Sequence, residues 1–236
     1  MIPIGDSTRS RTTPYVNVAI IAAAVGVFLY ELTLSAVDVN RFFLDWGVIP
    51  KQLIDWLESP SGAEEPATVF ASMFMHGGWL HLIGNMLYLW VFGDNVEDAM
   101  GHVRYLLFYL LAGIGAAALQ VFVDQDSLIP MVGASGAISG VLAAYLVLYP
   151  RATVAVVIPW LWFFGAFPLP AAFLIVFWFL LQLLNGVASL GTATGVTEGV
   201  AVWAHVGGFI TGLVLVWGFR RRGGRRRPRR QSGEAG

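Results

Sequence analysis

Two polar residues, Ser135 and His205, lie in apolar segments of the chain and have side chains suited to acyl transfer. Ser135 belongs to the sequence Gly-Ala-Ser-Gly at residues 133–136, which opens a stretch apolar enough to form a membrane helix. His205 lies in a second such stretch, 70 residues further along. Serine attacks a carbonyl only when a base removes its proton, and histidine is the side chain most often used for this. The pair therefore indicates hydrolysis of a peptide bond inside a lipid bilayer.

The surroundings of Ser135 suit a nucleophile, although they also suit simple helix packing. As the first residue of a helix, Ser135 would lie where free backbone N–H groups and the helix dipole favour developing negative charge. Gly133 and Gly136 leave the backbone open to a close-approaching substrate or helix. Gly136 and Gly140 also form a small-xxx-small face, which is common between packed membrane helices.

His205 is followed by Gly208 and Gly212, which occupy the same face of a helix as the histidine. This glycine face would let its helix press against the helix that begins at Ser135 and bring the two side chains together. An ionisable residue within a membrane segment indicates a functional site. A buried, hydrogen-bonded structural histidine is the alternative reading.

A third group of polar residues precedes these two. His81 and Asn85 are four residues apart, so one helix face presents both side chains. Both can donate hydrogen bonds to the oxygen of a tetrahedral intermediate, together with the backbone N–H of Ser135, and such donors supply much of the catalysis in acyl transfer. A metal site formed by His76, His81 and His205 is a competing reading. The chain lacks a His-Glu-x-x-His carboxylate and has no cysteine, so we expect no metal.

No carboxylate is placed to complete a triad. Asp94 lies 13 residues after His81, about 20 Å along a helix, and Asp98 lies further still. Glu198 precedes His205 by seven residues, roughly 10 Å along a helix. We therefore expect the base to work in a Ser–His dyad without an acidic third member.

The composition is that of a polytopic membrane protein rather than a soluble domain. Of the 236 residues, 57% are hydrophobic and only 12% are charged, and the mean hydropathy is +0.69. Soluble domains carry roughly a quarter of charged residues. The absence of cysteine excludes disulfides and thiolate metal sites.

Six segments are long and apolar enough to cross a membrane, at about 20 residues per crossing. They are Tyr15–Leu34, Trp79–Val96, Val103–Val123, Ser135–Tyr149, Pro170–Leu190 and Val200–Phe219. A signal peptide is an alternative reading of the first segment, but no good Ala-x-Ala cleavage site follows it. We predict an all-α fold with an N-terminal segment (1–14), a six-span domain (15–219) and an Arg-rich tail (220–236).

Three features interrupt this simple pattern of crossings. The aromatic-rich residues 35–78 form a long loop that we expect to lie in the outer membrane interface. Residues 151–169 are apolar but contain prolines, which argues against one helix and places them at the cytoplasmic face. The span that begins at Ser135 is only about 22 Å long, short of the ~30 Å hydrocarbon core. Ser135 would then lie below the outer surface, where a water-filled cavity must supply the water for hydrolysis.

Orientation follows from the basic residues. With six spans, twelve arginines share one side of the membrane with both termini, eight of them between Arg220 and Arg230, whereas the other side has only Arg41 and Lys51. By the positive-inside rule both termini are cytoplasmic and the site opens toward the outer side. The arginine cluster indicates topology and contact with anionic lipids rather than nucleic acid.

Together these motifs resemble those of the rhomboid family of intramembrane serine proteases, over essentially residues 14–219. The family's Gly-x-Ser-Gly motif matches Gly133–Gly136, which implies that Ser135 is the nucleophile. Its histidine in the last span, with glycines three and seven residues later, matches His205, Gly208 and Gly212.

The remaining family motifs match the second span. His-x-x-x-Asn matches His81 and Asn85, the histidine upstream of that pair matches His76, and Glu-x-x-x-Gly matches Glu97 and Gly101, which implies a structural lock at the cytoplasmic end. The chain departs from the family at Ser139, where many relatives carry an aromatic residue packed against the catalytic imidazole.

The resemblance implies a six-helix, bacterial-type protease of the inner (plasma) membrane that cleaves single-span or polytopic membrane proteins in or near their spans. No cofactor is implied. In the family the fifth span or its outer loop is thought to admit substrate, and Trp178 and Phe177 would face such a gate. The alternatives are a catalytically silent relative that binds membrane clients, and a transporter, for which the chain lacks a repeated half and an intramembrane carboxylate pair.

Overall fold

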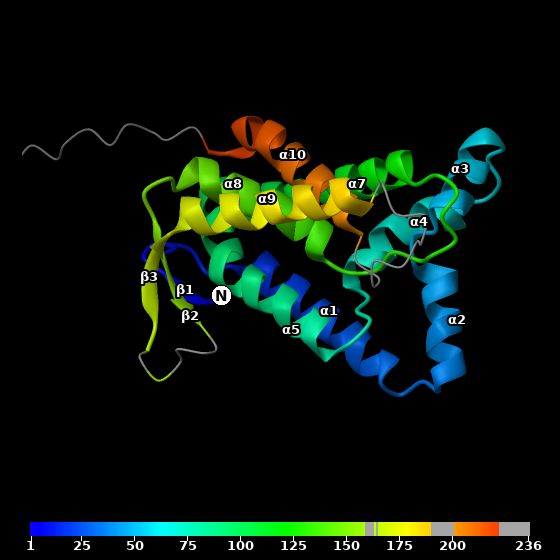
Figure 1. Ribbon diagram of the computed structural model, residues 1–236, viewed down its shortest axis with the longest axis horizontal. Coiled ribbons are helices and arrows are strands. Elements are labelled where there is room, and N and C mark those ends of the chain that lie inside the picture. Colours follow the sequence, from blue (N-terminus) through cyan, green and yellow to red (C-terminus); the bar gives the residue numbers. More distant parts are fainter. Residues whose placement is uncertain (159–162, 164, 190–200, 222–236) are drawn as a thin grey trace, which may run out of the picture.

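The computed structural model describes residues 1–158, 163, 165–189 and 201–221 of the chain. Most of these residues form helices, and four of the longer helices, α7 to α10, lie side by side, whereas α1 and α5 cross them obliquely (Figure 1). In chain order the elements are β1 (Ile2–Asp6), α1 (Tyr15–Glu31), α2 (Ala36–Trp46), α3 (Pro50–Glu58), α4 (Glu64–Ala71), the 3-10 turn η1 (Ser72–Phe74), α5 (Trp79–Tyr88), the π-helix η2 (Leu89–Gly93), α6 (Asp94–Met100), α7 (His102–Val123), α8 (Ser135–Leu148), β2 (Thr153–Val157), β3 (Phe167–Pro170), α9 (Ala171–Ser189) and α10 (Val202–Phe219).

Each of the six predicted spans corresponds to a helical segment of the described residues, although α1 ends at Glu31 rather than Leu34 and Pro170 belongs to β3. Among these residues, α7, α9 and α10 are long and apolar enough to cross a membrane, and α1 and α8 are shorter apolar helices. The predicted second span runs through α5, η2 and α6 without a break and ends at Met100 rather than Val96. A mostly helical membrane protein is thus confirmed, while six crossings remain a prediction.

The core of the bundle is formed by α7, α8 and α10. Every residue of α8 from Gly136 to Tyr145 is buried. Glycines allow this, because a Cβ added at Gly136 or Gly140 would overlap Ala116 or Ala112 of α7. The short helix α8 is therefore surrounded by protein. This packing fixes the position of Ser135, which is the first residue of α8.

The π-helix η2 marks the place where α1 crosses the second span. A π-helix leaves backbone groups out of the regular α-helical pattern. Here the buried Asn17 of α1 donates from Nδ2 to the carbonyl of Leu89 (2.9 Å) and accepts from the Tyr105 hydroxyl at its Oδ1 (2.8 Å). Gly93 has no room for a Cβ against these groups. The Leu89 carbonyl of the irregular turn is thus satisfied by a side chain of α1, which is held in turn by a side chain of α7.

A three-stranded antiparallel sheet, in the order β1-β2-β3, was not part of the all-α prediction. The apolar, proline-interrupted residues 151–169 contribute β2 and β3, with Val154 and Val156 buried. β1 pairs with β2, so that Ile2 lies opposite Val157. The sheet was missed because its first strand lies far from its partner in the chain.

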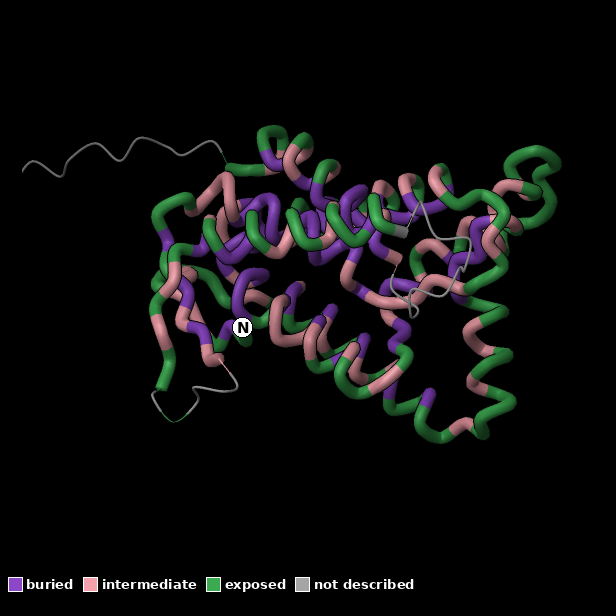
Figure 2. The backbone as a smooth tube through the Cα atoms, viewed as in Figure 1, coloured by how far each residue is buried: buried purple, intermediate pink, exposed green. Residues whose placement is uncertain are grey.

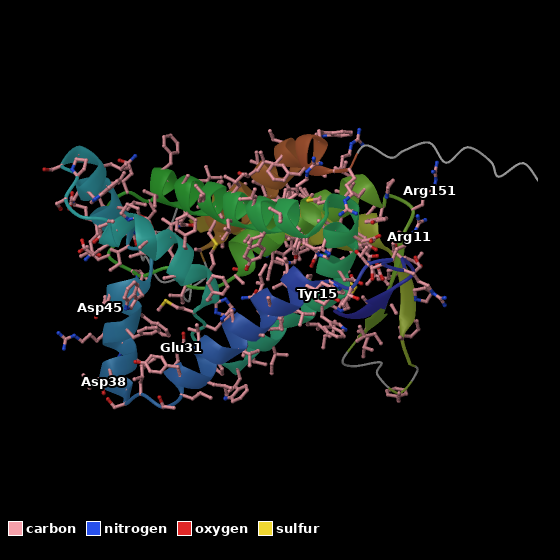
Figure 3. All side chains as sticks on the ribbon, turned by 180° about the vertical axis from the view of Figure 1, so that it is seen from behind. Arg11, Tyr15, Glu31, Asp38, Asp45 and Arg151 are labelled. Atoms are coloured by element: carbon pink, nitrogen blue, oxygen red, sulfur yellow. The ribbon has the colours of Figure 1, made fainter. Side chains whose placement is uncertain are left out.

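The sheet marks one end of the bundle, and the loop segment 35–78 marks the other (Figure 1). That segment folds into α2, α3, α4 and η1, and an isolated β-bridge between Val48 and Met131 joins it to the loop before α8. In Figure 3 the labelled Arg11 and Arg151 lie at the sheet end, while Asp38 and Asp45 lie at the opposite end. We call the two ends the sheet end and the loop end.

Candidate active site

The two residues singled out first in the sequence are hydrogen-bonded to each other. Ser135 Oγ lies 2.8 Å from His205 Nε2. Ser135 is the first residue of α8, where the backbone N–H has no partner within the helix. His205 lies in the first turns of α10, and its side chain is largely buried. The structure therefore presents a serine hydroxyl to an imidazole nitrogen in the geometry of a nucleophile and its base.

Contact between α8 and α10 brings these two residues together. A Cβ added at Gly208 would overlap the backbone of Gly136, and one at Gly212 would overlap the backbone of Gly140. The two helices therefore meet backbone against backbone, one and two turns below the serine–histidine pair. This is the close approach that small residues permit between membrane helices.

His81 and Asn85 lie on the same cavity as this pair. The His81 ring is packed against Gly133, where the backbone has φ +124° and a Cβ would overlap the ring. Asn85 is buried, and its Nδ2 has no hydrogen-bond partner. A buried amide donor without a partner is unusual, because its desolvation is not offset by a hydrogen bond. Asn85 is therefore a donor free to meet an incoming acceptor.

The cavity has a volume of about 840 Å³. Polar groups occur on its wall at Ser135, His205, His81 and Asn85, and most of the remaining wall is apolar, formed by Leu80, Tyr88, Val132, Ile138, Leu142 and Trp178 among others. A mostly apolar cavity with a few convergent polar groups is typical of a site for a hydrophobic ligand or segment.

His76 lies behind His81 and does not line this cavity. It is 1% exposed, and its ring packs edge-on against the His81 ring with 5.1 Å between centroids. Its backbone N–H donates to the buried Glu31 carboxylate (3.2 Å), and its Nδ1 lies 3.2 Å from the Phe74 carbonyl. His76 therefore supports the position of His81.

Sequence reasoning missed Gln182 of α9. Its Oε1 lies 2.8 Å from His205 Nδ1, on the side of the ring away from Ser135. The Trp178 ring, one turn earlier on α9, lies 5.6 Å from the His205 ring. Trp178 thus contacts the imidazole, whereas Phe177 is exposed and stacks on Phe173. The available signal was a glutamine within a strongly apolar helix.

Ser139 makes no hydrogen bond to the imidazole. Its hydroxyl donates to the Ser135 carbonyl one turn earlier (2.7 Å). Asp94 and Asp98 lie on α6 and do not line the cavity: Asp98 accepts from Thr12, and Asp94 accepts from Asn95, which also donates to Asp6 of β1. Glu198, the third carboxylate considered from the sequence, falls outside the described residues. Within the residues that the structure describes, histidines and carboxylates form no group of three that could hold a metal ion.

Glu97 and Gly101 lie at the sheet end. The fully buried Glu97 carboxylate accepts from the backbone N–H groups of Val16 (3.0 Å) and Asn17 (2.7 Å) and lies 2.5 Å from His102 Nδ1. It thereby satisfies the free donors at the start of α1. Gly101 has φ +85° and no room for a Cβ beside the Arg221 side chain.

These observations define a class: a helical membrane protein with a serine–histidine pair on a largely apolar cavity. The rhomboid domain family model matches residues 63–222, more than half of the chain. RHOMBOID-like protein 6, mitochondrial, from Arabidopsis thaliana is 30% identical over 162 residues, which are 69% of this chain and 46% of that protein.

Two further relatives come from other eukaryotes. Rhomboid-like protease 5 of Toxoplasma gondii is 33% identical over 147 residues (61% of this chain, 15% of that protein). Rhomboid protein 1, mitochondrial, of Saccharomyces cerevisiae is 26% identical over 155 residues (64% and 41%). The chain belongs to the rhomboid family. It spans less than half the length of each of these three relatives.

Proposed function

We propose that this protein is an intramembrane serine endopeptidase that cleaves membrane proteins in or near their transmembrane segments. The observation that carries the proposal is the 2.8 Å contact between Ser135 Oγ and His205 Nε2 on a largely apolar cavity. The name of the Toxoplasma gondii relative, a rhomboid-like protease, supports the same activity.

In the proposed reaction, Ser135 Oγ attacks the carbonyl carbon of the scissile peptide bond while His205 Nε2 takes its proton. His205 then gives that proton to the leaving nitrogen as the C–N bond breaks, which leaves an acyl-enzyme. A water molecule then attacks the acyl carbon while His205 takes one of its protons. His205 returns this proton to Ser135 Oγ as the ester bond breaks, which releases the acid product and restores the serine. Every proton transfer uses the one imidazole nitrogen that faces Ser135.

The negative oxygen of the tetrahedral intermediate needs donors. We assign this role to the Ser135 backbone N–H and the side chains of His81 and Asn85. The unpartnered Asn85 Nδ2 supports the assignment, because an acceptor bound in the cavity would give it a hydrogen bond. Donors aimed at a developing charge in a site of low polarity are the largest single contribution to many hydrolytic reactions.

The chain is proposed to cross the membrane six times, as a domain over residues 15–219 between an N-terminal segment (1–14) and the Arg-rich tail (220–236). We place both termini on the cytoplasmic side of a bacterial plasma membrane, with the loop end and the cavity toward the outer side. The separation of Arg11 and Arg151 from Asp38 and Asp45 in Figure 3 supports this orientation. The tail would contact anionic lipids.

The proposal is tested with purified protein in detergent and a fluorescent reporter that contains a transmembrane segment. Ser135→Ala and His205→Ala should each lower cleavage by at least about 10³-fold, since loss of either member disables the whole unit. Ser139→Ala is the matched control, because it removes a buried hydroxyl from the same helix. A serine-directed fluorophosphonate should label the wild type and Ser139→Ala but not Ser135→Ala. Undiminished cleavage by Ser135→Ala would exclude the mechanism.

A further inference from the structure

The second nitrogen of the His205 ring meets a neutral amide of α9 rather than a carboxylate. Nδ1 lies 2.8 Å from Oε1 of Gln182, while Nε2 faces Ser135 at the same distance. Both ring nitrogens are therefore engaged, from two different helices. Gln182 does not itself line the cavity, and its hydrogen bond to the site is made to the imidazole.

This contact determines which ring nitrogen holds the proton. With Oε1 turned toward the ring, the amide can only accept a hydrogen bond, so Nδ1 carries the hydrogen in this arrangement. A neutral imidazole has one N–H, which leaves the lone pair of Nε2 directed at the Ser135 hydroxyl. When His205 takes the serine proton, the Nδ1–H donor remains bonded to Oε1 and helps to stabilise the cation. In a catalytic triad an aspartate binds Nδ1–H and orients the imidazole. A serine–histidine dyad has no such aspartate, and here Gln182 occupies the corresponding position.

A second contact from the same helix face restrains the plane of the ring. Trp178 precedes Gln182 by four residues, so both side chains leave α9 on the same side. The Trp178 ring is tilted by 43° to the imidazole at a centroid distance of 5.6 Å. Gln182 therefore binds Nδ1 at the edge of the His205 ring, while the Trp178 ring packs against the imidazole. No such contact comes from Ser139 of α8, whose hydroxyl is bonded to its own helix.

We propose, on the basis of the proposed proteolytic function, that Gln182 is the positioning residue of the base: its amide oxygen holds His205 in the Nδ1–H tautomer. Because Gln182 is carried by α9, the protonation geometry of the base depends on the placement of that helix. The Ser135–His205 distance does not, since it is determined by α8 and α10.

The tautomer can be read directly by nitrogen NMR of protein labelled with ¹⁵N-histidine. The chain has only four histidines, so the signals that disappear in His205→Ala are those of His205. The wild type without substrate should show a protonated Nδ1 and an unprotonated Nε2 at His205. In Gln182→Met, which keeps the length of the side chain but removes the acceptor, the proton should be distributed over both nitrogens. A wild-type spectrum with the proton on Nε2 would overturn the proposal by itself.

Turnover supplies the second readout. Gln182→Met should lower kcat about tenfold with an unchanged KM, the effect expected for one hydrogen bond between neutral groups. Gln182→Glu, which restores an acceptor of the same shape, should recover the Nδ1–H signal and a kcat above that of Gln182→Met. Leu180→Ala, at an exposed position of α9, is the control and should resemble the wild type.

The results for the Gln182 variants and for Ser135→Ala test the positioning role of Gln182 and the proteolytic function separately. Wild-type kcat in Gln182→Met, or no recovery in Gln182→Glu, would contradict a positioning role while leaving Ser135-dependent cleavage intact. Cleavage that persists in Ser135→Ala would instead remove the proteolytic mechanism, whatever tautomer the NMR spectrum reports.

Discussion

Helix α10 packs against α8 on one side and α9 on the other, and the two interfaces are built differently. Against α8 the contact is backbone to backbone through Gly208 and Gly212. Against α9 it is made by large side chains, above all the stacked rings of Phe179 and Phe209, with centroids 4.2 Å apart. Figure 2 shows the difference in burial, because α8 is largely purple whereas α9 is mainly green and pink.

The exposed side chains of α9 confirm this difference. They are Phe173, Val176, Phe177, Leu180, Leu181, Leu184 and Val187. Fewer contacts within the protein therefore hold α9 than hold α8, and regions of low contact density open more readily. In contrast, backbones in direct contact cannot shift without separating the helices. The distance between nucleophile and base is thus held by backbone contact, and the orientation of the base is held by side chains of α9.

The largest expected effect on turnover comes from a side chain that separates α8 from α10. In Gly212→Val the added side chain would overlap the backbone of Gly140, which cannot yield as a flexible side chain would. We expect a loss of at least about 1–3 kcal/mol of stability, typical of overpacking, and no measurable cleavage. Thermal unfolding and reporter cleavage check this. Gly218→Val on the same helix, where a Cβ meets nothing within 4 Å, should leave both unchanged.

A smaller effect is expected from loosening the second interface. Phe179→Ala removes the ring that stacks on Phe209, so α9 should hold Gln182 less firmly against His205. An aromatic pair is worth about 0.5–1.5 kcal/mol beyond its buried area, so we expect kcat to fall roughly two- to tenfold. The matched control is Leu184→Ala, since this side chain of α9 is 66% exposed. Equal kcat values for the two variants would refute the coupling of α9 to the base.

The smallest effect on turnover is expected from a change outside both interfaces. Glu97→Gln removes the carboxylate that accepts from Val16 and Asn17 and contacts His102 at the sheet end. Stability should fall by about 1–3 kcal/mol, because buried donors lose their charged partner. The kcat of the folded protein should nevertheless match that of the wild type. Asp45→Asn, at an exposed carboxylate of α2, is the control, and a fall in kcat for Glu97→Gln alone would mean that the sheet end influences the chemistry.

The serine–histidine contact could be predicted from the sequence because glycine spacing reports helix faces directly. Gly208 and Gly212 lie on the His205 face of α10, and a glycine face predicts close approach to another helix. His81 and Asn85 were likewise placed on one face by their spacing. Their roles in the reaction stay predictions until the variants are measured.

Gln182 and the sheet could not be predicted, for two different reasons. Gln182 stands out as a polar residue in the mostly apolar α9, but which face of α9 meets α10 depends on tertiary packing, so the sequence does not show that Gln182 points at the base. The sheet depends on pairing between β1 and β2, which are separated by most of the bundle. The short apolar run of β2 alone is compatible with several structures.

The pairing of β1 with β2 also constrains the order in which the protein is assembled. Chains emerge from the ribosome with the N-terminal residues first, so β1 is made before any helix of the bundle. Its partner Val157 follows only after α8, and β3 later still. The ladder must then close a very long loop, a step whose entropic cost is reduced once the helices between the two strands have packed. Strand pairing thus begins only after the nucleophile helix has been synthesised.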